Sequence, residues 1–124
     1  MSEETPHYAL RFTPRAAADI DAAHARFMEM VSEEIADEWK AGLFEAVAPL
    51  AMIPQWQIAP ERVRFRQEVR QIIYRRRAGS VAYRVLYIIV ESEDDAPYVR
   101  ILHIRHGSAR PITRAEAREL ETGL

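Results

Sequence analysis

The hydrophobic positions in the first half of the chain recur every three or four residues, which is the spacing of one face of an α-helix. Thr13 and Pro14 precede the first run and Ser32 precedes the second, and all three suit the start of a helix. The apolar positions are Ala16, Ile20, Ala23, Phe27 and Val31, and then Ile35, Trp39, Leu43, Ala46, Leu50 and Ile53. The pattern predicts two amphipathic helices, the second reaching Pro54, that form a helical hairpin.

Four other segments have the composition of β-strands. They are residues 8–12, 69–74, 81–90 and 98–105. Short turns separate the last three segments, so we expect these strands to be antiparallel. After the last strand, Thr113 and Glu116 have the spacing of a capping box, which predicts a short helix over residues 114–121.

The order of these elements, β-α-α-β-β-β with a short C-terminal helix, indicates an α+β fold. We expect the helical hairpin to pack on one face of a small, mostly antiparallel sheet. The first strand reaches the sheet through a long helical crossover, which allows it a parallel neighbour. In this arrangement the other face of the sheet is uncovered, and the functional residues are expected there.

The length of 124 residues predicts one domain over residues 8–124, after a disordered lead of residues 1–7. No apolar run approaches the ~20 residues of a membrane-spanning helix, which argues against a membrane protein. The first four residues are acidic or polar, unlike the basic start of a secretory signal. There is no cysteine, which excludes disulfides and thiolate metal sites. We expect a cytoplasmic protein without a metal or cofactor.

Charge is distributed unevenly along the chain. Residues 1–60 carry four basic and ten acidic side chains, whereas residues 61–124 carry thirteen basic and nine acidic ones. Nearly all basic residues are arginine, which binds phosphate or carboxylate with a planar fork, although a GC-rich genome also favours arginine. A basic cluster is a candidate surface for nucleic acid or an acidic protein segment, and the alternative is a solvated face. Its members are Arg62, Arg64, Arg66, Arg70, Arg75, Arg76 and Arg77.

Four stretches of the sequence are similar to landmarks of one protein family. Residues 8–16, Tyr-Ala-Leu-Arg-Phe-Thr-Pro-Arg-Ala, are similar to a first strand followed by a Ser/Thr-Pro-x-Ala helix start. Residues 69–72, Val-Arg-Gln-Ile, are similar to the second strand, and residues 83–87, Tyr-Arg-Val-Leu-Tyr, to a Tyr-Arg-apolar-apolar-Tyr strand. Residues 99–107 are similar to a last strand that ends in a His- or Arg-bearing turn. In this order they resemble the RelE/ParE toxin superfamily.

The resemblance implies a toxin of a type II toxin–antitoxin system of the plasmid stabilisation type. Such a toxin inhibits growth and is neutralised by a cognate antitoxin in a hetero-oligomeric complex. ParE-like members inhibit DNA gyrase and are not hydrolases, whereas RelE-like members cleave mRNA on the ribosome. We predict a ParE-like toxin with gyrase as its target. The alternatives are a RelE-like endoribonuclease and an inactive relative that acts only as a binding partner.

For the ribonuclease alternative, the resemblance places the catalytic roles on Arg84, Arg105 and His106. Arg84 matches the arginine that RelE-like enzymes use on the phosphate, and its other interpretation is a structural ion pair. Arg105 ends the last strand, and His106 can act as an acid or base near neutral pH. RelE-like enzymes also carry lysines on the second strand and a tyrosine near the C-terminus. Here the only lysine is Lys40 and no tyrosine follows Tyr98, so the catalytic set is incomplete.

Two histidines belong to the last predicted strand. His103 and His106 are three residues apart, so on a regular strand their side chains point to opposite faces. They can share a site only if a bulge or turn intervenes. We therefore interpret each as a hydrogen-bonded structural histidine rather than as part of a metal pair.

Overall fold

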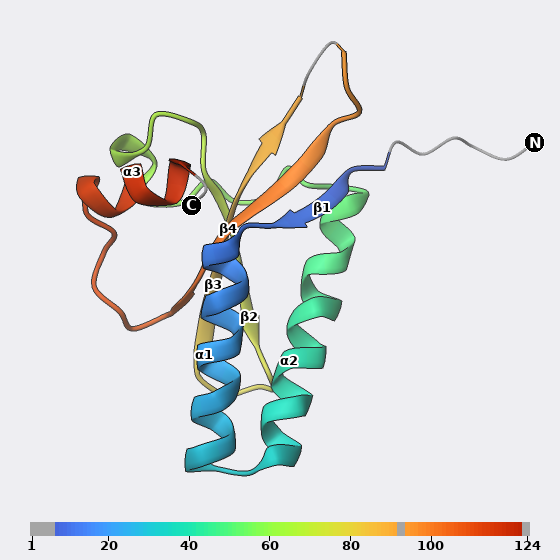
Figure 1. Ribbon diagram of the computed structural model, residues 1–124, viewed down its shortest axis with the longest axis vertical. Coiled ribbons are helices and arrows are strands. Elements are labelled where there is room, and N and C mark those ends of the chain that lie inside the picture. Colours follow the sequence, from blue (N-terminus) through green and yellow to red (C-terminus); the bar gives the residue numbers. More distant parts are fainter. Residues whose placement is uncertain (1–6, 92–93, 123–124) are drawn as a thin grey trace, which may run out of the picture.

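The computed structural model describes residues 7–91 and 94–122 (Figure 1). Residues 1–6 of the predicted disordered lead lie outside the described residues, and His7 is exposed ahead of the first strand. The elements are β1 (Ala9–Phe12), α1 (Pro14–Met30), α2 (Glu33–Val47), the 3-10 helices η1 (Ala48–Ala51) and η2 (Arg62–Arg64), β2 (Arg70–Arg75), β3 (Ala82–Val90), β4 (Tyr98–His106) and α3 (Arg114–Thr122). The predicted α+β order is confirmed, and strand ends differ from prediction by one residue at most.

The four strands form one sheet in the order β1-β4-β3-β2. Strands β2, β3 and β4 are antiparallel neighbours, and β1 pairs with β4 in parallel, as the helical crossover allows. The pairing of β4 with β3 passes from Ile101 directly to His103, so Leu102 is an extra residue in β4. This bulge shifts the alternation of side chains, and Ile101 and Ile104 therefore both face the helical hairpin.

The helices begin at the predicted capping residues. The hydroxyls of Thr13 and Ser32 each accept a hydrogen bond of 3.1 Å from the backbone N–H three residues later. At the start of α3, the Glu116 N–H donates to the Thr113 hydroxyl at 3.1 Å, and the Thr113 N–H donates to the Glu116 carboxylate at 2.9 Å. This reciprocal pair is the predicted capping box.

The predicted end of the second helix is wrong. Helix α2 ends at Val47 and the chain continues in η1, instead of remaining α-helical to Pro54. Pro49 has no backbone N–H and cannot donate the next α-helical hydrogen bond, so the chain tightens into a 3-10 turn. Leu50 still points into the core, which is why the apolar rhythm continued past the helix. No helix of the described residues is long and apolar enough to cross a membrane.

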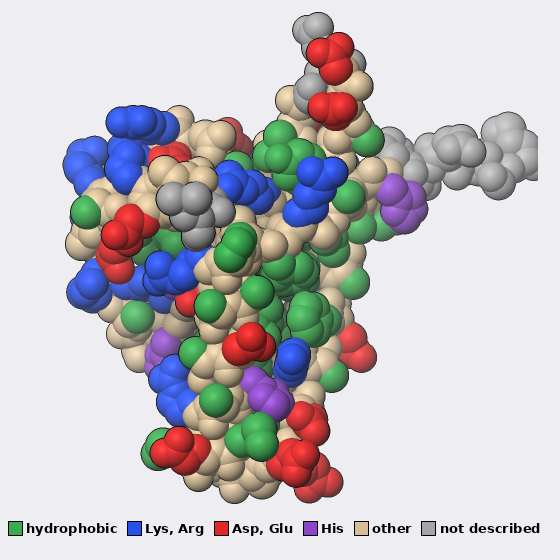
Figure 2. Space-filling model, in the orientation of Figure 1, with side chains coloured by type: hydrophobic (Ala, Val, Ile, Leu, Met, Phe, Trp, Pro, Cys, Tyr) green, Lys and Arg blue, Asp and Glu red, His purple; other side chains and the backbone are tan. Residues whose placement is uncertain are grey.

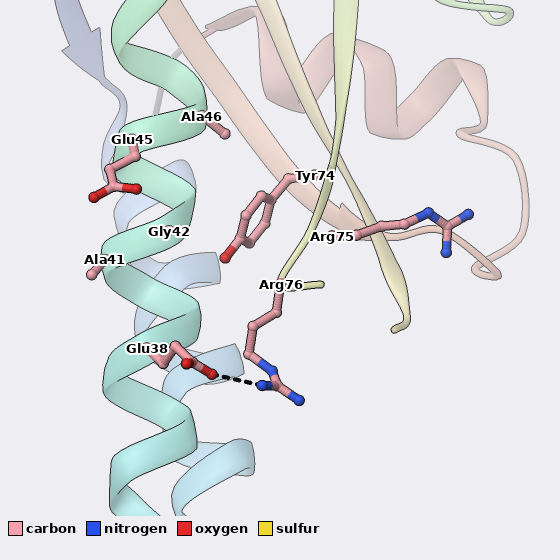
Figure 3. Close-up of a pocket in the computed structure, with 8 residues that line it drawn as sticks. All are labelled: Glu38, Ala41, Gly42, Glu45, Ala46, Tyr74, Arg75 and Arg76. Carbon is pink, nitrogen blue, oxygen red and sulfur yellow. Dashed lines mark hydrogen bonds and ion pairs between the residues drawn. The ribbon is translucent and has the colours of Figure 1, made fainter. Parts of the chain in front are cut away.

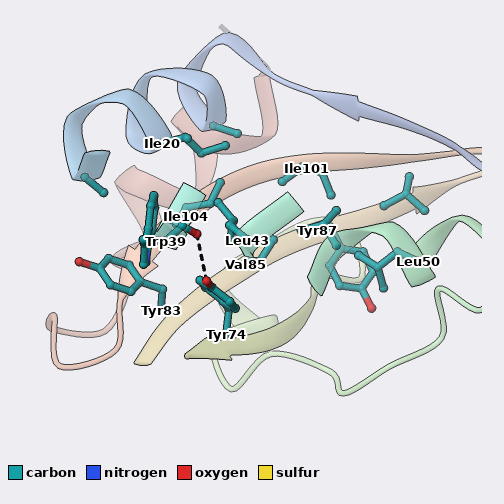
Figure 4. Packing of buried hydrophobic residues seen from close by; sticks show 14 residues of the cluster. Ile20, Trp39, Leu43, Leu50, Tyr74, Tyr83, Val85, Tyr87, Ile101 and Ile104 are labelled. Carbon is teal, nitrogen blue, oxygen red and sulfur yellow. Dashed lines mark hydrogen bonds between the residues drawn. The ribbon is translucent and has the colours of Figure 1, made fainter. Parts of the chain in front are cut away.

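The main hydrophobic core lies between the helical hairpin and the sheet (Figure 4). Trp39, from the apolar stripe of α2, is 1% exposed, and its ring centroid lies 5.1 Å from that of Tyr83 and 5.5 Å from that of Phe27. The Tyr74 hydroxyl donates a hydrogen bond of 2.9 Å to the Trp39 carbonyl. This bond joins β2 to α2 through the core.

A second core cluster covers most of the second face of the sheet, and the prediction that this whole face is uncovered is wrong. Side chains from the 54–69 connector and from α3 pack on it as a second core cluster, because both segments carry scattered apolar residues. The cluster contains Ala59, Phe65, Val69, Leu86, Ile88, Leu102, Ile112, Ala117 and Leu120. Beyond this cluster the same face is open around Ile73, which is 47% exposed.

Candidate functional site

Arg84 and Arg105 lie side by side on the second face of the sheet. They are direct partners in the register of β3 and β4, so their side chains emerge from the same face. Arg84 contributes to a hollow of about 480 Å³ between the connector and the segment that leads into α3. Its lining residues are Pro60, Glu61, Val63, Arg64, Arg84, Ala109 and Pro111. This hollow is the candidate site that best matches the sequence prediction.

The guanidinium of Arg84 is held by a buried carboxylate. Its Nη1 and Nη2 donate to the two oxygens of Glu61 at 3.0 and 2.6 Å, and its Nε donates to the Gln71 side-chain carbonyl at 2.8 Å. The side chains of Arg84 and Glu61 are only 12% and 6% exposed. Glu61 also accepts a hydrogen bond of 3.2 Å from the Ile112 N–H. The ion pair therefore fastens the connector and the C-terminal segment to β3.

These contacts set the ionisation of Glu61. Burial disfavours the carboxylate and by itself raises the pKa. The hydrogen bonds from Arg84 and from the Ile112 N–H, together with the Arg84 charge, outweigh burial and lower the pKa of Glu61 from 4.5 to about 2. Glu61 is thus a carboxylate at all ordinary pH values, and Arg84 has a permanent counter-ion.

Arg105 is also held by the protein. Its Nε and Nη2 donate to the Arg110 carbonyl at 3.1 and 2.6 Å, and its Nη1 lies 3.6 Å from a Glu116 carboxylate oxygen. Glu116 pairs with Arg110 as well, and hydrogen bonds from Arg110 and from the Thr113 N–H lower the pKa of Glu116 to about 2. Arg105 therefore closes the loop before α3 onto the sheet.

His103 connects this loop to α1. Its Nδ1 lies 2.5 Å from a carboxylate oxygen of Asp19, and its Nε2 lies 3.3 Å from the Arg105 Nη1. Arginine can only donate, so the His103 Nε2 accepts from Arg105 and its Nδ1 faces Asp19. The same Asp19 oxygen accepts a hydrogen bond of 3.1 Å from the Ile104 N–H. Asp19 thereby covers the part of β4 that extends beyond β1 in the sheet.

His106 lies away from both arginines. Its ring is 5.4 Å from the ring of Tyr83, on the sheet face under the helical hairpin, and its Nδ1 accepts from the Ser108 N–H at 3.1 Å. The Leu102 bulge precedes His103, so it does not bring the two histidines together. The structure thus places Arg84 and Arg105 together and His106 apart. The catalytic roles of the three residues remain predictions.

The predicted basic cluster is divided over three places. Arg62, Arg64 and Arg66 lie on and after η2, next to α3, where Arg64 donates to the Ile112 carbonyl at 2.7 Å. Figure 2 shows basic side chains gathered on this side of the molecule. Arg70 binds Glu68 and the Trp56 carbonyl, both at 2.5 Å. The third group lies at the end of β2 and just after it, and consists of Arg75, Arg76 and Arg77. The cluster is therefore not one continuous binding face.

Sequence reasoning missed three residues of this arrangement. Glu61 looks like an isolated acid between a proline and a run of arginines, and nothing in its spacing connects it to Arg84. Gln71 and Asp19 likewise have no local sequence signal. One hint was available, since the interpretation of Arg84 as an ion-pair residue requires a carboxylate nearby.

The described residues contain no group of three or more His, Asp or Glu that could hold a metal ion.

Comparisons with known proteins agree with this fold. The family model of the ParE toxin of the type II toxin–antitoxin system, parDE, matches residues 10–111. A chain of a solved chromosomal ParDE toxin–antitoxin system from P. aeruginosa superposes with a TM-score of 0.61 and 24% sequence identity. The similar region covers 81% of this chain and 96% of that chain, and at this identity it shows a shared fold. No curated protein matches the sequence.

Proposed function

Because the chain belongs to the ParE toxin family of type II toxin–antitoxin systems, we propose that it inhibits growth by binding DNA gyrase and that a cognate antitoxin neutralises it. Its action is non-enzymatic in this proposal. The antitoxin and the toxin form a hetero-oligomeric complex. The family supports the toxin assignment, and the choice between binder and ribonuclease rests on the state of Arg84.

The ion pair between Glu61 and Arg84 is the observation that carries the proposal. A ribonuclease of the RelE type needs an arginine here to stabilise the negative charge that develops on the phosphate. In this chain Glu61 and Gln71 engage all three guanidinium nitrogens of Arg84. Releasing Glu61 would leave a buried charge unpaired, at a cost of about 3–5 kcal/mol. This cost favours a structural Arg84 and a toxin that acts by binding.

A pulse-expression experiment separates the two activities. We expect wild-type expression to arrest growth and alter plasmid supercoiling, with mRNA intact by primer extension. The informative variant is Glu61→Leu/Arg84→Met, which replaces both charges by apolar side chains and so leaves no unpaired ion. Circular dichroism first checks that this variant is folded. If Arg84 has only a structural role, the folded variant is still toxic.

The alternatives give different results in the same assay. Codon-positioned mRNA cuts that disappear in the double variant would identify a RelE-like ribonuclease and overturn the proposal. No growth defect from a folded, well-expressed wild-type chain would identify the inactive relative. That outcome would also reject gyrase as the target.

A further inference from the structure

The sheet has two edges, the outer side of β1 and the outer side of β2. At the β1 edge, the Tyr8 N–H, just ahead of β1, donates to the Ala51 carbonyl at 2.7 Å, and Asp19 covers the Ile104 N–H of β4 beyond β1. Among the described residues, hydrogen bonds cover the outer edge of β2 only at its start, where the Gln71 N–H donates to the Gln57 carbonyl at 2.8 Å. The connector runs antiparallel to β2 there, through the bridge between residues 58 and 70, and it does not follow the later residues of β2.

The uncovered stretch presents two residues with outward backbone groups. Alternate residues of an antiparallel edge strand turn their N–H and C=O away from the sheet. The Gln71 N–H points away from β3 toward the connector. The backbone N–H and C=O of Ile73 and Arg75, two and four residues later, therefore point outward as well. Among the described residues, none of the hydrogen bonds between turns, loops and caps reaches the backbone of either residue. Such a row of unpaired groups is a template for another strand.

Two hollows between α2 and β2 follow this edge. The first hollow, about 400 Å³, is lined in part by Trp56 and Ile73, which are 53% and 47% exposed. The second, about 600 Å³, lies beside Tyr74 and Arg76 and is drawn in Figure 3. Both include Ala46. The edge strand therefore has apolar surface at one end and a polar recess at the other.

The edge is fixed in place before any partner arrives. A Cβ atom on Gly42 would lie 2.1 Å from the Tyr74 hydroxyl oxygen, so only glycine lets Tyr74 approach α2 this closely. Arg76 donates to Glu38 of α2 at 2.6 Å, as the dashed line in Figure 3 shows. A preformed site loses little conformational entropy when it binds.

Charge selects the kind of segment that fits. Arg75 and Arg77 are exposed, and in the part of the chain that the structure describes no carboxylate lies within 4.0 Å of either guanidinium. Arg75 shares the sheet face of Ile73, because residues two apart on a strand point the same way. On the helix side, the exposed Glu45 borders the recess and disfavours a second acid. An acid is therefore favoured opposite Arg75 and an apolar residue opposite Ile73.

We propose that the outer edge of β2 receives an extended segment of a partner protein as a fifth strand. The segment runs antiparallel to β2 and has the pattern acid, any residue, apolar residue. Its acid lies opposite Arg75, its apolar side chain lies against Ile73 and Trp56, and its backbone binds Ile73 and Arg75. The identification of this partner as the antitoxin rests on the proposed function, whereas the strand addition itself does not.

The test uses the full chain, labelled with ¹⁵N, and a capped synthetic peptide, Thr-Thr-Glu-Thr-Val-Thr-Thr. In a titration followed by amide chemical shifts, we expect saturable shifts of the Ile73 and Arg75 amides and of the Trp56 indole N–H. A peptide N-methylated at Glu and Val cannot donate to the edge and should bind about fivefold more weakly or worse. A peptide with Lys in place of Glu should lose about two- to fivefold.

Reversing the charge at position 75 tests most sharply whether Arg75 selects the acidic peptide. The Arg75→Glu variant should prefer the Lys peptide to the Glu peptide, whereas the matched variant Arg62→Glu, on η2, should keep the wild-type preference. The proposal is overturned if no saturable shifts occur up to about 5 mM peptide. It is also overturned if the shifts lie elsewhere, if N-methylation has no effect, or if Arg75→Glu does not reverse the preference.

These results are independent of toxicity. Peptide binding at the edge by a chain that does not inhibit growth would leave the strand addition standing and remove the toxin function. Growth arrest by a chain whose edge binds no peptide would support the toxin function and overturn the strand addition.

Discussion

Glutamine at position 61 keeps the shape of the glutamate side chain but removes its charge, and the Arg84 guanidinium then stays buried without a counter-ion. The pKa of Glu61 falls from 4.5 to about 2 on folding, which corresponds to about 3 kcal/mol of stability at neutral pH. Removing one partner of a buried ion pair typically costs about 3–5 kcal/mol. The two arguments agree, so we expect Glu61→Gln to lower the free energy of unfolding by about 3 kcal/mol.

Urea denaturation at pH 7 measures this loss, with Glu68→Gln as a matched control. Glu68 pairs with Arg70 on the surface, where its side chain is 57% exposed, and its loss should cost less than about 1 kcal/mol. The double variant Glu61→Leu/Arg84→Met should recover most of the stability, because it leaves no unpaired charge.

The pH dependence supplies a second, independent check. A carboxyl whose folded pKa is lowered stabilises the protein fully above its unfolded pKa, here 4.5, and loses that contribution as the pH falls toward about 2. The stability difference between wild type and Glu61→Gln should therefore be constant above pH 5 and shrink below 4.5. A loss under about 1 kcal/mol, or a difference that does not change between pH 5 and pH 2, would refute the buried ion pair.

Three further substitutions test the fold around the site. Asp19→Asn removes the charged acceptor of His103 and of the Ile104 N–H, and we expect a loss of about 1–3 kcal/mol, measured by thermal unfolding, with Asp21→Asn as an exposed control. Gly42→Ala places a Cβ against the Tyr74 hydroxyl and should cost about 1–3 kcal/mol in urea denaturation; no loss would contradict the close approach of α2 and β2. Thr113→Ala removes the capping box, should cost about 1 kcal/mol, and should speed hydrogen exchange in α3 more than in α1.

The sequence allowed prediction of elements whose signals are local. The caps at Thr13 and Ser32 and the capping box at Thr113 each depend on residues three apart, and all three were confirmed. The end of α2 was wrong because Leu50 continues the apolar rhythm through a 3-10 turn, and periodicity alone does not distinguish the two kinds of helix. Local patterns thus identified elements better than their ends.

Long-range contacts were beyond the reach of these patterns. The apolar residues Ile112, Ala117 and Leu120 that cover the second face are too few and too scattered to predict a second core cluster. The Glu61–Arg84 pair joins residues 23 positions apart through the path of an irregular connector. Arg84 was found because it lies in a strand motif, but its counter-ion depends on tertiary structure.

The most direct test of the central claim is a supercoiling assay with purified DNA gyrase, relaxed plasmid, ATP and the purified chain. The account predicts inhibition of supercoiling that saturates with the chain's concentration and is retained by the folded Glu61→Leu/Arg84→Met variant. The account would be contradicted if gyrase kept its full activity at the highest concentration of the chain and if the chain cut mRNA on purified ribosomes in an Arg84-dependent way.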